Sequence, residues 1–150
     1  MRNDVSSKQP ATTKAEARPL TQRYSETPTA TKVAKPWGWE LLWTLPGLPY
    51  VGKVLHIDKG HRLSLQVHEF KTESWMLMKG RAMAVWENND GVLAECELES
   101  GRGYTCESGR KHRLVGITDC DIVEVSTPEV GTTWRLDDDY GRGDQQIPGT

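Results

Sequence analysis

An amide, a carboxylate and two imidazoles occur at spacings that could form one metal site: Gln66, His68, Glu73 and His112. Gln66 and His68 lie two positions apart in the alternating segment LSLQVHEF (63–70), so both face the same side of a half-buried strand. Polar side chains on an inward face are costly unless they are paired or liganded. A mixed set of nitrogen and oxygen donors suits a divalent ion such as Zn, Mn, Fe, Co or Ni. Because four protein ligands leave an octahedral ion with open positions, such a site could bind substrate as well.

The segments that must position these side chains have the pattern of short strands separated by turns. The NNDG turn (88–91) between AMAVWE and VLAECEL is a strong hairpin signal, because Asn and Gly tolerate positive φ. No segment has the apolar spacing of three and four residues that a helix needs, so we expect little helix. Many short antiparallel strands predict an all-β sandwich or small barrel. The alternating runs predict strands near 51–57, 62–68, 73–79, 81–87, 92–98, 103–106, 112–116 and 120–126.

Composition divides the chain into a domain and two ends. Residues 1–34 are rich in Thr, Ser, Lys, Pro and Ala and have almost no large apolar side chains, which predicts a flexible N-terminal tail. Residues 35–142 are the predicted domain, and residues 143–150 are a predicted loose C-terminal end. The slightly positive tail could touch an anionic partner, although a solvated leader with no role is the simpler interpretation.

Charge, hydropathy and cysteine usage exclude several functional classes. The formal net charge of −2 provides no polycationic surface for nucleic acid or an anionic membrane. No apolar run approaches the roughly 20 residues that a spanning helix needs, and the N-terminus lacks the pattern of a secretory signal. The three cysteines have no zinc-like spacing, so we expect reduced thiols that pack in the interior of a cytoplasmic protein.

Two sequence signatures connect the predicted ligands to a known superfamily. The string GHRLSLQVHEFKTESWMLMKG (60–80) resembles the first cupin signature, G-x5-H-x-H-x3,4-E-x6-G, with Gln66 in place of its first His. The string ESGRKHRLVG (107–116) resembles the second signature, P-x-G-x2-H-x3-N, and keeps its Gly and His at Gly109 and His112. The chain is therefore identified as a member of the cupin superfamily by resemblance.

The glutamine at the first ligand position is typical of the phosphomannose isomerase branch of cupins. The segments KPWGWE (35–40) and WRLDDDYGR (134–142) are similar to the opening and closing elements of that branch. The chain thus resembles small standalone cupins similar to the C-terminal domain of type II mannose-6-phosphate isomerases. The resemblance implies a double-stranded β-helix jelly roll, metal ligands at Gln66, His68, Glu73 and His112, and a homodimer.

The same resemblance implies a metal-dependent aldose–ketose isomerase that acts on a sugar phosphate such as mannose 6-phosphate. In such an enzyme the metal polarises the sugar oxygens while a base moves a proton between C1 and C2. The phosphate requires cationic side chains at the barrel mouth. The candidates for this role are Lys71, Lys111, Arg113, Arg135 and Arg142.

Departures from the branch pattern keep other functions open. Typical type II enzymes have HHHRAEHW where this chain reads VHEFKTESW, so Lys71 replaces an Arg while Phe70 and Ser74 replace histidines. The pattern identifies no general base. One scaffold supports many activities, so two alternatives stand beside the isomerase. The first is a non-catalytic or regulatory cupin that binds a small anionic ligand or sugar nucleotide, and the second is another metal-dependent enzyme such as a dioxygenase.

Overall fold

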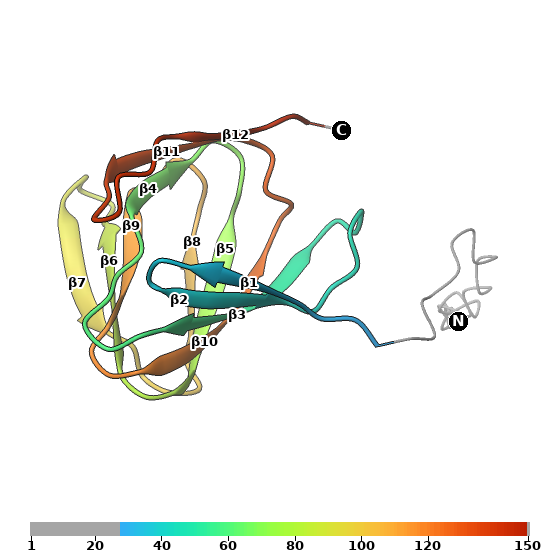
Figure 1. Ribbon diagram of the computed structural model, residues 1–150. Helices are drawn as coiled ribbons and strands as arrows, with labels where there is room; N and C mark the ends of the chain where they lie inside the picture. Colours follow the sequence, from blue (N-terminus) through green and yellow to red (C-terminus); the bar gives the residue numbers. More distant parts are fainter. Residues whose placement is uncertain (1–27, 150) are drawn as a thin grey trace, which may run out of the picture.

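The chain folds into two antiparallel sheets that face each other (Figure 1). The computed structural model describes residues 28–149, in which no helix occurs and therefore none that could span a membrane. One sheet has the strand order β1-β2-β3-β10-β5-β8 and the other β12-β11-β4-β9-β6-β7. The strands are β1 (Thr31–Lys35), β2 (Gly38–Leu42), β3 (Val51–Ile57), β4 (Leu65–His68), β5 (Glu73–Lys79), β6 (Ala82–Glu87), β7 (Leu93–Glu97), β8 (Gly103–Cys106), β9 (His112–Gly116), β10 (Cys120–Ser126), β11 (Gly131–Asp137) and β12 (Gln145–Ile147).

The strands predicted from alternation are confirmed as β3 to β10. The ends of β3, β5, β8, β9 and β10 coincide with the predicted ones, whereas β4 begins at Leu65 rather than at residue 62. Alternation succeeds for these strands because one face of each packs into the space between the sheets.

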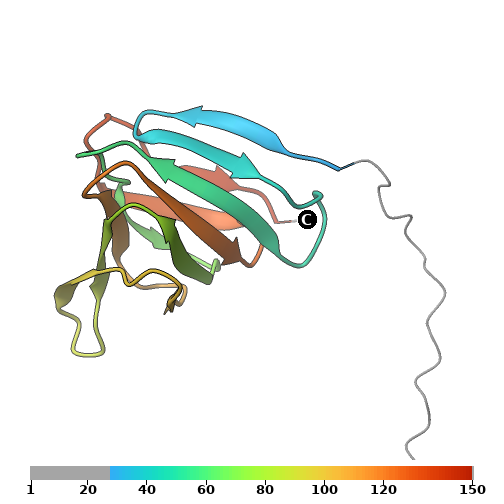
Figure 2. The same ribbon diagram turned by 90° about the horizontal axis from the view of Figure 1, so that it is seen from below.

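Strands extend beyond both predicted domain boundaries. The boundary at residue 34 falls inside β1, which pairs with β2 at the outer edge of its sheet (Figure 2), and residues 1–27 of the predicted tail lie outside the described residues. Most of β1 is exposed on both faces, so its sequence TKVAK carries no apolar alternation. At the other end β12 pairs with β11 inside the predicted loose segment. Backbone pairing, which leaves little trace in side-chain pattern, orders both edge strands.

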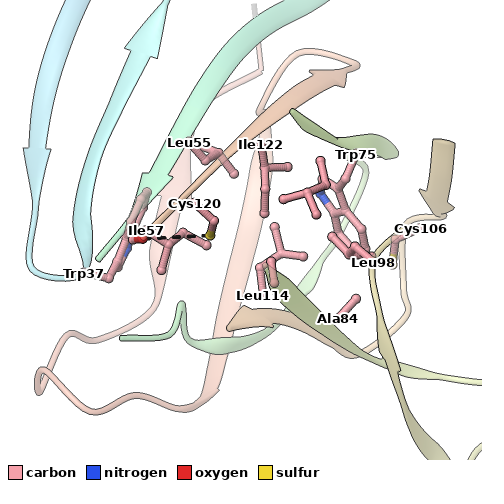
Figure 3. Close-up of a cluster of buried hydrophobic side chains, with 12 residues drawn as sticks. Trp37, Leu55, Ile57, Trp75, Ala84, Leu98, Cys106, Leu114, Cys120 and Ile122 are labelled. Atoms are coloured by element: carbon pink, nitrogen blue, oxygen red, sulfur yellow. Dashed lines mark hydrogen bonds between the residues drawn. The ribbon is translucent and has the colours of Figure 1, made fainter. Parts of the chain in front are cut away.

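The space between the sheets changes from apolar to polar along the strands. In the β3–β10 pair, Leu55 lies opposite Ile122, and the next inward pair is Lys53 and Glu124. All four of these side chains are buried. The apolar end fills the interior (Figure 3) with Trp37, Leu55, Ile57, Trp75, Leu77, Ala82, Ala84, Leu98, Cys106, Leu114, Cys120 and Ile122. The polar end therefore gathers the side chains that could do chemistry.

A tight turn at Gly80 joins β5 to β6 at the apolar end. Gly80 has φ +78°, and a Cβ there would collide with the carbonyl oxygen of Asp119. Gly101 has a similar φ of +75° but open space around the Cβ position. We expect Gly80→Ala to lower the free energy of unfolding by about 2 kcal/mol and Gly101→Ala by about 1 kcal/mol in chemical denaturation. Equal losses would show that the backbone around Gly80 relaxes to admit a methyl group.

Candidate metal centre

Three buried side chains from three strands converge at the polar end of the interior. His68 of β4, Glu73 of β5 and His112 of β9 each offer a ligand atom, and these atoms all lie within 4.8 Å of one another. β4 and β9 are neighbours in one sheet, where Gln66 pairs with His112, while Glu73 comes from the facing sheet. The residues are only 2% to 3% exposed. The cluster therefore links the two sheets across the interior.

Both ring nitrogens of His112 face oxygen atoms. Its Nδ1 lies 3.0 Å from the carbonyl oxygen of Arg110, and its Nε2 lies 2.8 Å from Glu73 Oε1. Burial alone would lower the pKa of His112, but its neighbours Cys106 and Glu73 raise it to about 10. Without a metal, the ring is an imidazolium that donates from Nε2 to Glu73. A metal ion bound by Nε2 would take the place of that proton.

His68 is held with its other nitrogen available to the cluster. Its Nδ1 lies 2.8 Å from Thr133 Oγ1, and its Nε2 lies 3.7 Å from Glu73 Oε2. Burial and the charge of Lys71 lower the pKa of His68 to about 4, so the ring is neutral at pH 7. Donation from Nδ1–H to Thr133 leaves the Nε2 lone pair pointing to the cluster, which is how partner groups orient metal-binding histidines.

Gln66 completes the cluster at its outer side. The Gln66 Nε2 atom lies 3.4 Å from His68 Nε2 and 3.5 Å from His112 Nε2, while Ser64 donates a hydrogen bond to Gln66 Oε1. A half-turn of the Gln66 amide about its terminal side-chain bond exchanges its oxygen and nitrogen atoms. The oxygen then faces the two histidines, and the amide nitrogen donates a hydrogen bond to the Ser64 hydroxyl. The structure thus places the amide beside both imidazoles, and its role as a fourth ligand stays a prediction.

The chemistry of the cluster fits a divalent metal ion. Glu73 Oε2 is buried and makes no hydrogen bond within residues 28–149, although Lys71 Nζ lies 2.5 Å away without suitable alignment. Lys71 shares its charge between Glu73 and Glu124, so a metal ion would be a second cation at this buried carboxylate oxygen. Two imidazole nitrogens, this carboxylate and an amide oxygen are donors that transition metals prefer.

Metal affinity should depend on pH through His112. Because this imidazolium loses its Nε2 proton when metal binds, while His68 is already neutral, each bound ion should displace about one proton near neutral pH. We expect the apparent affinity to rise about tenfold for each pH unit between about pH 6 and pH 8. Isothermal titration calorimetry in buffers of different ionisation enthalpy measures the released proton directly. An affinity that stays constant across this window would contradict the assignment of His112 as a ligand.

A small charged pocket adjoins the cluster on the side of Gln66 and His68. Its volume is about 130 Å³. Lys71, which is 5% exposed, lies between the cluster and this pocket, 2.8 Å from Glu124 Oε1. Although burial favours the neutral amine, Glu124 and Glu73 raise the pKa of Lys71 above its usual value. The cations outnumber the acids in the lining, which includes Lys35, Lys53, Lys71, Arg135 and Arg142 against Glu40, Glu124 and Glu129.

The structure brings Lys71, Arg135 and Arg142 to this pocket and places the other two predicted cations elsewhere. Arg135 keeps a buried Nε without a partner among the described residues, so it retains a free donor. The guanidinium of Arg142 is largely taken up by Asp138, 2.6 Å from its Nη2. These three side chains are the ones that could meet an anion beside the cluster.

Lys111 and Arg113 lie outside the pocket, each for a different reason. Lys111 lies 3.4 Å from Glu87 in an ion pair at the surface. Arg113 follows His112 in β9 and therefore points to the opposite face, where it donates to Asp137 and to the carbonyl oxygen of Leu63. His112 thus occupies the inward position, and Arg113 lies buried on the opposite face of the strand beside Leu63 and Asp137.

Comparison with known proteins identifies the fold family. The family model described as "Mannose-6-phosphate isomerase C-terminal" matches residues 22–139. The chain belongs to this family. Its jelly roll is that of the cupins, as the two signatures predicted. No curated protein matches the sequence.

Solved cupin structures share the fold at low sequence identity. An oxalate decarboxylase from Lactobacillus farciminis, in complex with formate, has a TM-score of 0.58 and 19% identity over 67% of this chain and 31% of its own. The Bacillus subtilis oxalate decarboxylase at pH 4.6 has a TM-score of 0.61 and 16% identity over 71% of this chain and 30% of its own. An oxalate oxidase in complex with glycolate has a TM-score of 0.52 and 16% identity, over 59% and 46% respectively. This cupin therefore spans less than half the length of each, and the likeness shows the fold alone.

Several residues around the centre of this cupin were not predicted from its sequence. Glu124 and Lys53 occupy inward positions in strands whose other inward residues are apolar. Their place in this alternation was a signal that could have identified them. Thr133, which positions His68, had no comparable signal because β11 was not predicted as a strand.

Among the solved cupins of similar fold, Mn(II) centres are named for the Bacillus subtilis oxalate decarboxylase.

Proposed function

We propose that this cupin is a divalent-metal-dependent aldose–ketose isomerase that acts on a sugar phosphate such as mannose 6-phosphate. The observation that carries the proposal is the charged pocket, whose surplus of cations borders the cluster of metal-ligand residues. An anionic phosphate would be held by these cations with the rest of the sugar beside the cluster. The family, which is named after mannose-6-phosphate isomerase, supports the same class of substrate.

Each side chain around the centre has a distinct task in this proposal. Gln66, His68, Glu73 and His112 would hold the metal, predicted to be Zn, Mn, Fe, Co or Ni, which supplies Lewis-acid polarisation of sugar oxygens when bound. Lys71 and Arg135 would bind the phosphate, because both line the pocket and Arg135 has a free donor.

Glu124 is the side chain that we assign to proton transfer between C1 and C2. It lines the charged pocket and is 4% exposed, and its carboxylate accepts a hydrogen bond from Lys71. Burial raises the pKa of Glu124 more than the charge of Lys71 lowers it. A carboxyl with a raised pKa beside the substrate can both take and return a proton, as an isomerase requires.

Substitution of this carboxyl should separate catalysis from metal binding. We expect Glu124→Gln to lower kcat for the aldose–ketose reaction by about 100-fold while the metal content is unchanged. Glu95→Gln, on the exposed surface of β7, is the matched control and should leave kcat unchanged. A Glu124→Gln variant with full activity would exclude this residue as the proton carrier.

The proposal as a whole is tested by reloading metal-free protein with Zn, Mn, Co or Ni and adding a panel of hexose and pentose phosphates. Proton NMR should detect conversion of an aldose phosphate to its ketose in the metal-loaded samples only. Absence of turnover with every metal and sugar phosphate would refute the isomerase. Thermal stabilisation by a sugar phosphate without product would favour the binding protein, and oxygen uptake with iron would favour a dioxygenase.

The cellular setting belongs to the same proposal. We propose a cytoplasmic homodimer, supported by the free thiols of Cys96, Cys106 and Cys120 and by the family resemblance. Light scattering during size-exclusion chromatography should give twice the 16.9 kDa chain mass. A monomer at the working concentration would exclude the dimer without affecting the assigned metal ligands.

A further inference from the structure

A second and larger cavity, which shares no lining residue with the charged pocket, is connected to the metal centre through Trp75. Its volume is about 410 Å³, within the range of small-molecule sites. We call it the aromatic cavity, because Trp75 of β5 and Tyr104 of β8 line it from one sheet and Trp86 of β6 lines it from the other. The Trp75 ring centroid lies 5.5 Å from that of His112, and Figure 3 shows Trp75 near Cys106, which also lines the cavity.

Polar groups with unused hydrogen-bonding capacity accompany these rings. The indole Nε1–H of Trp75 is buried and has no acceptor within residues 28–149. Asn88 accepts hydrogen bonds from the backbone of its own turn, and Asn89 accepts one from Arg110, so both side-chain NH2 groups keep free donors in the described chain. The exposed carboxylate of Glu107 supplies acceptors at the rim. A ligand in this cavity therefore meets both donors and acceptors.

The charge of the lining distinguishes this cavity from the charged pocket. Glu87 and Glu107 contribute two carboxylates, whereas Arg110 is the single cation among the lining residues. The guanidinium of Arg110 already donates to the carbonyl oxygen of Glu87 and to Asn89 Oδ1. Because Glu87 is paired with Lys111, 3.4 Å away, the charges of Arg110 and Glu107 balance. The lining therefore has no surplus of cations for an anion, and its chemistry favours a neutral ligand.

We propose that the aromatic cavity binds a neutral sugar ring. The C–H faces of such a ring can pack on the Trp86 and Tyr104 side chains, which supply large rigid apolar surface. Its hydroxyl groups both donate and accept, which matches the mixed polar groups of Asn88, Asn89 and Glu107. This binding requires no reaction at the metal, so it stands independently of the proposed isomerase.

Closed-ring glycosides test this site because they cannot open and therefore cannot be isomerised. The full chain, with and without added Zn, is titrated with methyl α-mannoside, methyl β-glucoside, methyl β-galactoside and adenosine by calorimetry and saturation-transfer NMR. We expect at least one glycoside to bind. Trp86→Leu, which removes the ring but keeps apolar volume, should weaken that binding about tenfold. Trp134, which is 39% exposed, lies on the outer face of β11 and provides the control. Trp134→Leu should leave binding unchanged.

A substitution at the exposed rim provides a second measurement that does not depend on core packing. Glu107→Ala should weaken the same glycoside about threefold, and Glu95→Ala, at an exposed position of β7, should have no effect. The proposal is overturned if no glycoside binds the wild-type protein, or if adenosine alone binds. It is also overturned if Glu107→Ala and a folded Trp86→Leu both bind the glycoside as the wild type does.

Discussion

Replacing His112 with Ala should remove the bound metal and weaken metal affinity more than about 100-fold, because even the loss of a group that only orients a ligand costs 10- to 100-fold. His112 contributes a ring whose Nε2 lies 2.8 Å from Glu73 Oε1, whereas His68 Nε2 lies 3.7 Å from Glu73, so the loss of His112 leaves Glu73 without its closest partner in the cluster. Since a metal stabilises only the folded state, the rise in Tm on adding metal should disappear with it. Inductively coupled plasma mass spectrometry of the purified variant measures the metal content.

A matched histidine variant controls for this result. His61 is exposed and lies outside the ligand cluster, so His61→Ala should keep the metal content and the metal-dependent Tm of the wild type. Full metal occupancy in His112→Ala would show that the ion binds elsewhere. The proposed reaction at this centre would then lose its basis, whereas the jelly roll would be unaffected.

Replacing Lys71 with Met should destabilise the metal-free protein by about 3–5 kcal/mol, the usual cost of leaving buried charges uncompensated. Lys71 Nζ lies 2.5 Å from Glu73 and 2.8 Å from Glu124, and the two carboxylates lose their shared cation in the variant. In the wild-type protein, Lys71 and His112 hold the pKa of Glu73 well below its usual range despite its burial. Chemical denaturation at neutral pH measures the change in the free energy of unfolding.

A double variant identifies the source of that cost. Lys71→Met combined with Glu124→Leu removes both members of the ion pair, so we expect it to be more stable than Lys71→Met alone. Added metal should also reduce the cost of Lys71→Met, because a cation at Glu73 compensates one of the two carboxylates. A loss below about 1 kcal/mol for Lys71→Met would mean that water screens these charges as it does at a surface.

Alternation in β4 and β5 explains why the ligand cluster could be predicted from sequence. Once Gln66 and His68 are assigned to the inward face, Glu73 and His112 need only lie on neighbouring or facing strands to reach them. The same reasoning identifies β3 and β10, where apolar residues alternate, and their inward series includes Lys53 and Glu124. Those two charges were open to prediction, because a charged residue at an inward position signals a polar interior.

Features that depend on tertiary contacts were beyond this reasoning. The edge strands β1 and β12 are ordered by backbone pairing, and their exposed side chains carry no periodic signal. Thr133 reaches His68 only because β11 pairs with β4, a contact between segments 65 residues apart in the chain. Alternation would have excluded Arg113, since its neighbour His112 takes the inward position. The aromatic cavity likewise brings Trp86 and Tyr104 together from different sheets.

The most direct test of the metal centre is anomalous diffraction from crystals of the protein loaded with Zn. Our account predicts one anomalous peak at the cluster, about 2.0–2.2 Å from His68 Nε2, His112 Nε2 and a carboxylate oxygen of Glu73, with Gln66 Oε1 turned toward it. A peak outside the cluster, or none at it when His68, Glu73 and His112 are well ordered, would contradict the account.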